Sequence, residues 1–114
     1  MDKARRRELV EAYKEAKPQR GVFAVRCQAT GEVWTGIARD LDKQQNREWF
    51  ALRQRGHGNK ALQALWDVHG PDAFTFEALE AVGGEDLTPA GLADRLKDRE
   101  LEWRESLGAR KVAG

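Results

Sequence analysis

Apolar and polar positions near the start of the chain predict two strands joined as a hairpin. The segment 21–27, GVFAVRC, is rich in β-branched and aromatic residues, which favour extended structure. A second segment of this kind, 32–37, follows a Thr-Gly turn, as in a β-hairpin. Before the hairpin, residues 2–17 carry a thin apolar stripe at helical spacing, and Pro18 ends that predicted helix.

Helical patterns dominate the rest of the chain, with one more extended segment between them. Residues 41–54 have helical composition, and a Gly-His-Gly break follows them. The next helix is predicted to begin at its cap Asn59 and to close at Gly70. A third strand is predicted over 74–79. The last helix follows Thr88, which is a capping residue with a proline directly after it.

The order α-β-β-α-α-β-α predicts a single α+β domain. A small three-stranded, mainly antiparallel sheet flanked by helices would bury all the apolar stripes in one core. The length of 114 residues suits one such domain. We expect residues 1–20 to form a basic helix that packs on the domain, and residues 21–114 to form the domain itself.

Charge is distributed unevenly although the net charge is only +1. Residues 1–60 hold 14 Lys and Arg against 8 Asp and Glu, whereas residues 61–114 hold 6 against 11. A basic half can be the footprint of a phosphate backbone. The alternative is a solvated surface whose charges pair within the molecule.

Two absences in the sequence narrow the function classes. Cys27 is the single cysteine, which excludes an internal disulfide framework and a multi-cysteine zinc site. No apolar run is long enough to span a bilayer. We therefore expect a cytoplasmic protein without a membrane partner.

A carboxylate interrupts the apolar stripe of the last helix. Leu92, Leu96, Trp103 and Leu107 follow helical spacing, and the stripe position between Leu96 and Trp103 is Glu100. A carboxylate facing a core is costly unless it is paired. One interpretation is a residue at the edge of the stripe, bridged to a neighbouring arginine such as Arg99 or Arg104. The other is a metal ligand at the floor of a cleft, since Mg²⁺ needs only one or two protein carboxylates.

Several motifs occur together in a fixed order. The hairpin carries a Gly-Val-Phe segment that ends at Phe23 and, eleven residues later, a Trp-Thr-Gly segment that begins at Trp34. Further motifs occupy residues 34–41, 57–80 and 99–103. Taken together they resemble the GIY-YIG nuclease family, which includes homing endonucleases and excision-repair incision nucleases. The resemblance covers residues 21–107.

The resemblance implies a specific chemistry. GIY-YIG nucleases cut phosphodiester bonds with one divalent metal, Mg²⁺ or Mn²⁺, held by a helix glutamate that corresponds to Glu100. A hairpin tyrosine helps to activate water, and a helix arginine stabilises charge on the phosphate. The implied partner is DNA, with RNA as a further possibility and a second protein as a possible source of targeting.

The chain departs from this pattern at four positions. Phe23 and Trp34 stand where the family has tyrosines, and neither side chain can accept a proton. Gln44 stands where the family has arginine. The family's asparagine after the last helix has no clear counterpart near residues 108–111.

Nearby residues are candidate substitutes. Arg47 lies one helical turn beyond Gln44, and Arg39 lies at the mouth of that helix. His57 could take a proton near neutral pH. The alternative is that His57 is a loop histidine that caps the next helix. The candidate catalytic positions are therefore Phe23, Trp34, Arg39, Gln44, Arg47 and His57, with Glu100 as the metal ligand.

Three functional hypotheses follow. The first is a divalent-metal-dependent endonuclease with a degenerate catalytic set. The second is an inactive relative that holds nucleic acid through its basic residues. The third is a protein-interaction module, because a fold alone does not fix a function. The candidate nucleic-acid contacts are Arg5, Arg6, Arg7, Lys43, Arg47 and Lys60.

Overall fold

The computed structural model describes residues 18–113. The predicted helix 2–17 and its Arg5, Arg6 and Arg7 lie outside the described residues. Within the described range, four strands form one sheet in the order β3-β1-β2-β4. β1 pairs antiparallel with β2 and with β3, whereas β4 pairs parallel with β2. The strands are β1 (Gly21–Cys27), β2 (Val33–Ala38), β3 (Phe74–Ala81) and β4 (Arg110–Lys111).

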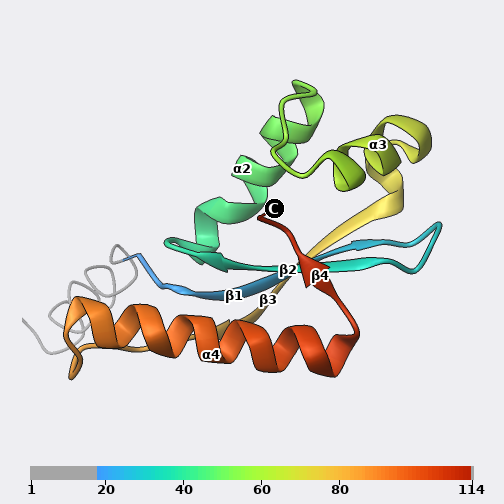
Figure 1. Cartoon of the computed structure of the whole chain (residues 1–114). Coiled ribbons are helices and arrows are strands. Elements are labelled where there is room, and N and C mark those ends of the chain that lie inside the picture. Colours follow the sequence, from blue (N-terminus) through green and yellow to red (C-terminus); the bar gives the residue numbers. More distant parts are fainter. Residues whose placement is uncertain (1–17, 114) are drawn as a thin grey trace, which may run out of the picture.

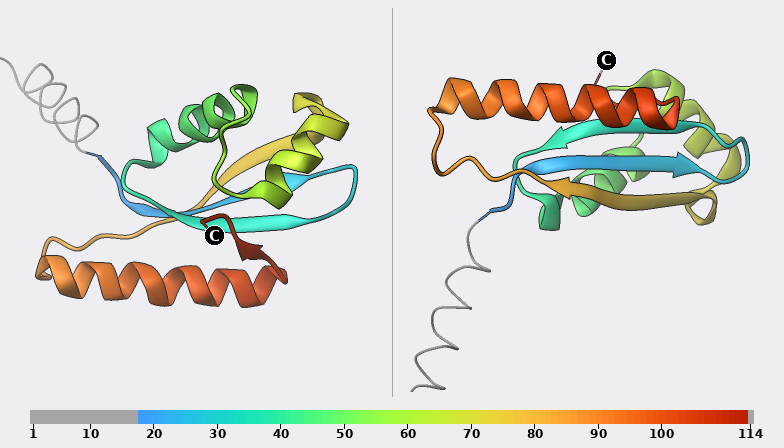
Figure 2. Two further views of the ribbon diagram at one scale, coloured as in Figure 1. Left: turned by 45° about the horizontal axis from the view of Figure 1, so that its top comes forward. Right: turned by 90° about the horizontal axis from the view of Figure 1, so that it is seen from below.

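Helices cover both faces of the sheet. Figures 1 and 2 show two helices, α2 (Leu41–Arg53) and α3 (Lys60–His69), on one face. The long helix α4 (Pro89–Leu107) runs across the other face. A short 3₁₀ turn, η1 (Pro71–Ala73), leads into β3. The predicted α+β class and the hairpin are confirmed. β1 has the predicted bounds, whereas the bounds of β2 and β3 differ from the predicted ones by one or two residues.

The predicted count of three strands is wrong, because the chain after α4 adds a fourth. Gly108 ends α4 in the left-handed conformation, with φ of 61°, and turns the chain back toward the sheet. β4 then pairs with β2, and the Val112 amide donates to the Thr35 carbonyl at 2.8 Å. A strand of two residues is too short to show any alternation of apolar and polar positions.

The core lies mainly between the sheet and helices α2 and α3. Phe23 on β1 stacks on Phe76 of β3 with ring centroids 5.3 Å apart. Trp66 of α3 packs against Phe74 at 5.2 Å. The cap predicted at Asn59 is confirmed, since its side chain accepts from the Leu62 amide at 3.0 Å and fixes where α3 begins.

On the opposite face, Glu80 of β3 fastens α4 to the sheet. Its Oε1 accepts hydrogen bonds from the Trp103 indole and from Arg99 Nε, each at 2.9 Å. The Trp103 hydrogen bond and the Arg99 guanidinium lower the pKa of the Glu80 carboxyl below 4.5, although its partial burial opposes the change. None of the helices within residues 18–113 has the length and apolarity needed to cross a bilayer.

Replacing Glu80 with glutamine should therefore destabilise the fold in a pH-dependent way. Since the folded-state pKa of Glu80 is depressed, its charge stabilises the fold above pH 4.5 and loses this effect as the pH falls through the folded value. Urea unfolding should show Glu80→Gln to be less stable than the natural chain at pH 7, with the difference shrinking at pH 3. The exposed Glu85→Gln is the control. An equal difference at both pH values would contradict this account.

Candidate functional cleft

A cleft lies at the β2 edge of the sheet, between α2, α4 and the C-terminal segment. Two adjacent cavities form it, one of 360 Å³ and one of 270 Å³. They share Ile37, Gln44 and Glu48 as lining residues. The larger cavity opens on the α2 side, and the smaller one reaches Glu100 of α4. Side chains from both faces of the sheet therefore meet in one place.

Glu100 is buried in this cleft with only 4% of its surface exposed. Its Oε2 accepts a hydrogen bond from the Thr35 hydroxyl at 3.2 Å and lies 3.2 Å from Arg104 Nε. Of the two arginines that the sequence suggested as partners, Arg104 pairs with Glu100. Glu100 is nevertheless buried and does not lie at an exposed edge of the helix stripe. Its charge is balanced by Arg104, which makes the burial tolerable.

Gln44, Glu48 and His57 form a hydrogen-bonded chain along the α2 wall. Glu48 is 7% exposed. Its Oε1 accepts from the Gln44 amide at 3.3 Å, and its Oε2 lies 2.5 Å from His57 Nε2. The Nδ1 of His57 accepts from the Asn59 amide at 2.9 Å. His57 therefore lies in the loop before α3 with both ring nitrogens engaged.

Sequence reasoning missed Glu48. The signal was present, because the buried residues of α2 are Leu41, Glu48 and Leu52, spaced seven and four apart. Such spacing places them on one helical face. The stripe argument that singled out Glu100 would have found this second buried carboxylate.

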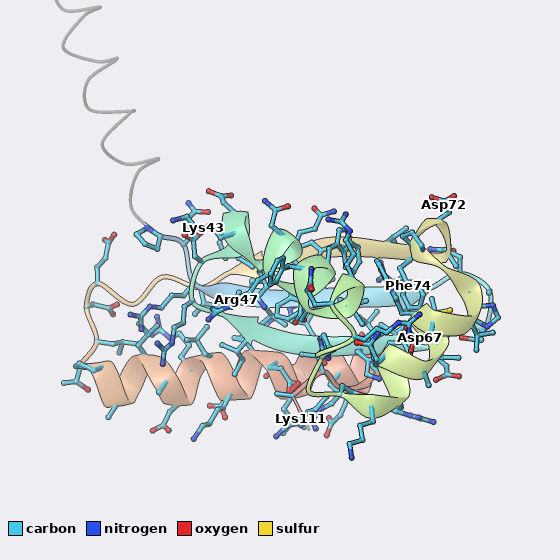
Figure 3. The ribbon with its side chains drawn as sticks, turned by 90° about the horizontal axis from the view of Figure 1, so that it is seen from above. Lys43, Arg47, Asp67, Asp72, Phe74 and Lys111 are labelled. Carbon is cyan, nitrogen blue, oxygen red and sulfur yellow. The ribbon has the colours of Figure 1, made fainter. Side chains whose placement is uncertain are left out.

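Two arginines line the larger cavity. Arg39 and Arg47 both contribute to its wall, with Gln44 between them. Neither arginine forms a salt bridge with any residue in 18–113. Figure 3 shows Lys43 and Arg47 along α2 and Lys111 on the C-terminal strand. This distribution is typical of a site for an anion.

The two aromatic residues of the hairpin motif face different spaces. Phe23 lines the Glu100 cavity, although it is only 1% exposed. Trp34 lines a separate cavity of 330 Å³ with Asn59 and Lys111. The structure thus places Phe23, Gln44 and Glu100 around the smaller cavity of the cleft. Arg39, Arg47 and His57 line the larger cavity, which shares the Gln44 wall with the smaller one. Trp34, Lys43 and Lys60 line neither of these two cavities.

The donor set fits one kind of metal ion. No group of three or more His, Cys, Asp or Glu side chains converges within the described residues, which disfavours a multi-ligand zinc site there. Both protein contacts of Glu100 go to Oε2. Its Oε1 accepts no hydrogen bond within residues 18–113. Every buried side-chain polar atom in this range has a hydrogen-bond partner, so Glu100 Oε1 is not buried and is accessible to solvent. A Mg²⁺ ion that keeps most of its waters fits this single oxygen.

Comparison with solved structures identifies the fold. The catalytic domain of homing endonuclease I-TevI matches with a TM-score of 0.67 and 25% identity, over 84% of this chain and 95% of that domain. A point mutant of the I-TevI catalytic domain matches with a TM-score of 0.65 and 23% identity, over 79% and 84%. The chain therefore has a GIY-YIG-like nuclease fold, in agreement with its motifs. In sequence, neither a family model nor a curated protein matches it significantly.

Gly36 is required for the shape of the cleft, which gives a direct test of the packing. A Cβ at this position would lie 2.5 Å from Val112 Cγ1 and 2.7 Å from Phe23 Cζ. Gly36→Ala should therefore lower the unfolding free energy by about 1–3 kcal/mol, as overpacking does. Gly83→Ala is the matched control, because a Cβ there meets nothing within 4 Å. Equal stability of the two variants in urea unfolding would contradict the packing described.

Proposed function

We propose that this chain is a divalent-metal-dependent endonuclease domain that hydrolyses phosphodiester bonds of DNA in the β2-edge cleft. The observation that carries the proposal is Glu100, a buried carboxylate opposite a wall that holds Arg39 and Arg47 without acidic partners in the described residues. The carboxylate can bind a metal cation and the arginines can bind a phosphate anion, so together they suit a metal-bound phosphate. The GIY-YIG-like fold supports the same class of reaction.

Each wall of the cleft has a separate task in this proposal. Glu100 holds the metal, and Thr35 and Arg104 fix the orientation of its carboxylate. Mg²⁺ or Mn²⁺, when bound, polarises the phosphoryl oxygen and assists the leaving group. Arg39 and Arg47 bind the phosphate and stabilise the charge that develops on it. Lys43 and Lys60 are exposed, and in this proposal they contact the DNA backbone outside the cleft.

An inactive nucleic-acid-binding relative is the second candidate. Phe23 favours it, because this side chain lines the Glu100 cavity without a hydroxyl that could act on water. The same cavity also lacks the arginine that the family places at the position of Gln44. Both candidates require the basic wall, and only the first requires Glu100 to hold a metal.

Cleavage of supercoiled plasmid separates the two candidates. The natural chain should nick DNA with Mg²⁺ or Mn²⁺ and not with EDTA. Glu100→Gln should reduce the rate by more than about 100-fold, since losing even an indirect partner of a metal ligand costs 10–100-fold. Glu105→Gln, on the exposed surface of the same helix, should cut normally. No nicking at concentrations where a gel shift shows binding would leave the inactive binder.

Salt dependence of DNA binding tests the arginine wall. Arg47→Gln should weaken binding and reduce the slope of log affinity against log salt by about 1, as expected for one lost phosphate contact. Arg39→Gln should behave alike. Lys97→Gln is the control, because Lys97 is exposed on α4 across the sheet from α2. Unchanged slopes in fluorescence anisotropy for both arginine variants would remove these residues from the interface.

A further inference from the structure

We propose that Glu48, and not His57, is the catalytic proton acceptor of the cleft, and that His57 is a positioning residue that orients it. The assignment rests on the proposed function, since it gives the hydrolytic reaction its base. Sequence comparison with the family points only to the tyrosine positions and to His57. The geometry of the buried chain along α2 points elsewhere.

His57 has no ring nitrogen free to take a proton. The Asn59 amide N–H donates to Nδ1 at 2.9 Å, so Nδ1 contributes its lone pair to that bond. The ring proton is then on Nε2, where it donates to Glu48 Oε2 at 2.5 Å. The backbone amide of His57 is also fixed, because it donates to Gln63 Oε1 at 3.1 Å. An imidazole held in this way orients a carboxylate and cannot itself activate water.

Glu48 has the free acceptor that His57 lacks. Its Oε1 receives only the Gln44 amide, at 3.3 Å, within residues 18–113. A carboxylate oxygen has two acceptor sites, so one remains for a water molecule. Glu48 also lines both cavities of the cleft, the one with Arg47 and the one with Glu100. A water held by Glu48 would therefore lie beside a bound phosphate.

The charges around Glu48 allow an anionic substrate to approach it. Arg39 and Arg47 face the larger cavity, and Lys111 lines the smaller one. The opposing carboxylate is Glu100 from α4, and His57 is the titratable group on the loop side. Three cations thus outnumber two carboxylates, and a phosphate can enter beside Glu48 without net repulsion.

Glu48 and Glu100 belong to helices on opposite faces of the sheet, which suits an in-line displacement. Attacking and leaving oxygens lie on opposite sides of the phosphorus. Glu48 enters the shared cavity from α2, on one face of the sheet, and Glu100 from α4, on the other. In the reaction, a water O–H bond breaks and its proton moves to Glu48 Oε1. The water oxygen bonds to phosphorus, the bond to the leaving sugar oxygen breaks, and that oxygen takes a proton from solvent.

The test compares single-turnover cleavage at saturating DNA for variants of the full chain. Glu48→Gln keeps the size of the side chain and an acceptor for His57. Its cleavage rate should fall about 10²–10⁴-fold, the usual contribution of a general base. DNA affinity and the thermal midpoint should stay close to the natural values. Glu105→Gln should retain the natural rate.

A second variant guards against a purely structural effect. Glu48→Ala opens space beside His57, and added formate should restore part of its cleavage rate by taking the proton in place of the side chain. If the natural chain cleaves DNA and Glu48→Gln cleaves it at the same rate, Glu48 is not the proton acceptor, and the proposed function stays intact. A loss in both variants without formate rescue, together with lower thermal midpoints, would also overturn it. Absence of cleavage by the natural chain would overturn the proposed function and this assignment with it.

Discussion

The contact between Glu100 on α4 and Thr35 on β2 is the interaction on which the cleft depends. A buried carboxylate costs several kcal/mol unless its charge is compensated, and here Thr35 and Arg104 supply the compensation. Thr35 does more than this, because its backbone carbonyl also accepts from the amide of Val112. One position on β2 therefore contacts both the helix that bears the carboxylate and the C-terminal segment that also lines the cleft. Without this pairing, the cleft would lose both its charge and its shape.

Asn59 is the corresponding junction on the α2 side. Its side chain caps α3 and donates to the carbonyls of Lys111 and Val112, each at 3.2 Å. Its backbone amide holds His57, which in turn holds Glu48. No buried side-chain polar atom in the described residues is left without a partner. Such fully satisfied networks fix the positions of functional groups before any substrate binds, which is what electrostatic catalysis requires.

The sequence was sufficient for the features that arise locally and insufficient for those that arise from tertiary contacts. β-branched and aromatic composition around a Thr-Gly turn predicted the hairpin, caps predicted the ends of helices, and one interrupted stripe singled out Glu100. The fourth strand was missed because its two residues are extended only through their pairing with β2. Sequence could not show that His57 is fully engaged, since its partners lie nine residues before it and two residues after it on different elements. Glu48 was within reach, because its spacing on α2 resembles that of Glu100 on α4.

The departures from the family pattern are physically linked. An arginine in place of Gln44 would lie one helical turn from Glu48 and would form an ion pair with it. That ion pair would occupy the acceptor site on Oε1 that is now free. Gln44 instead gives Glu48 a single weak donor. The positive charge lost at that position is available from Arg47, which lines the cavity beside Gln44. With Glu48 as the proposed base, the reaction needs no hydroxyl at Phe23, and Gln44 leaves an acceptor site on Glu48 Oε1 free.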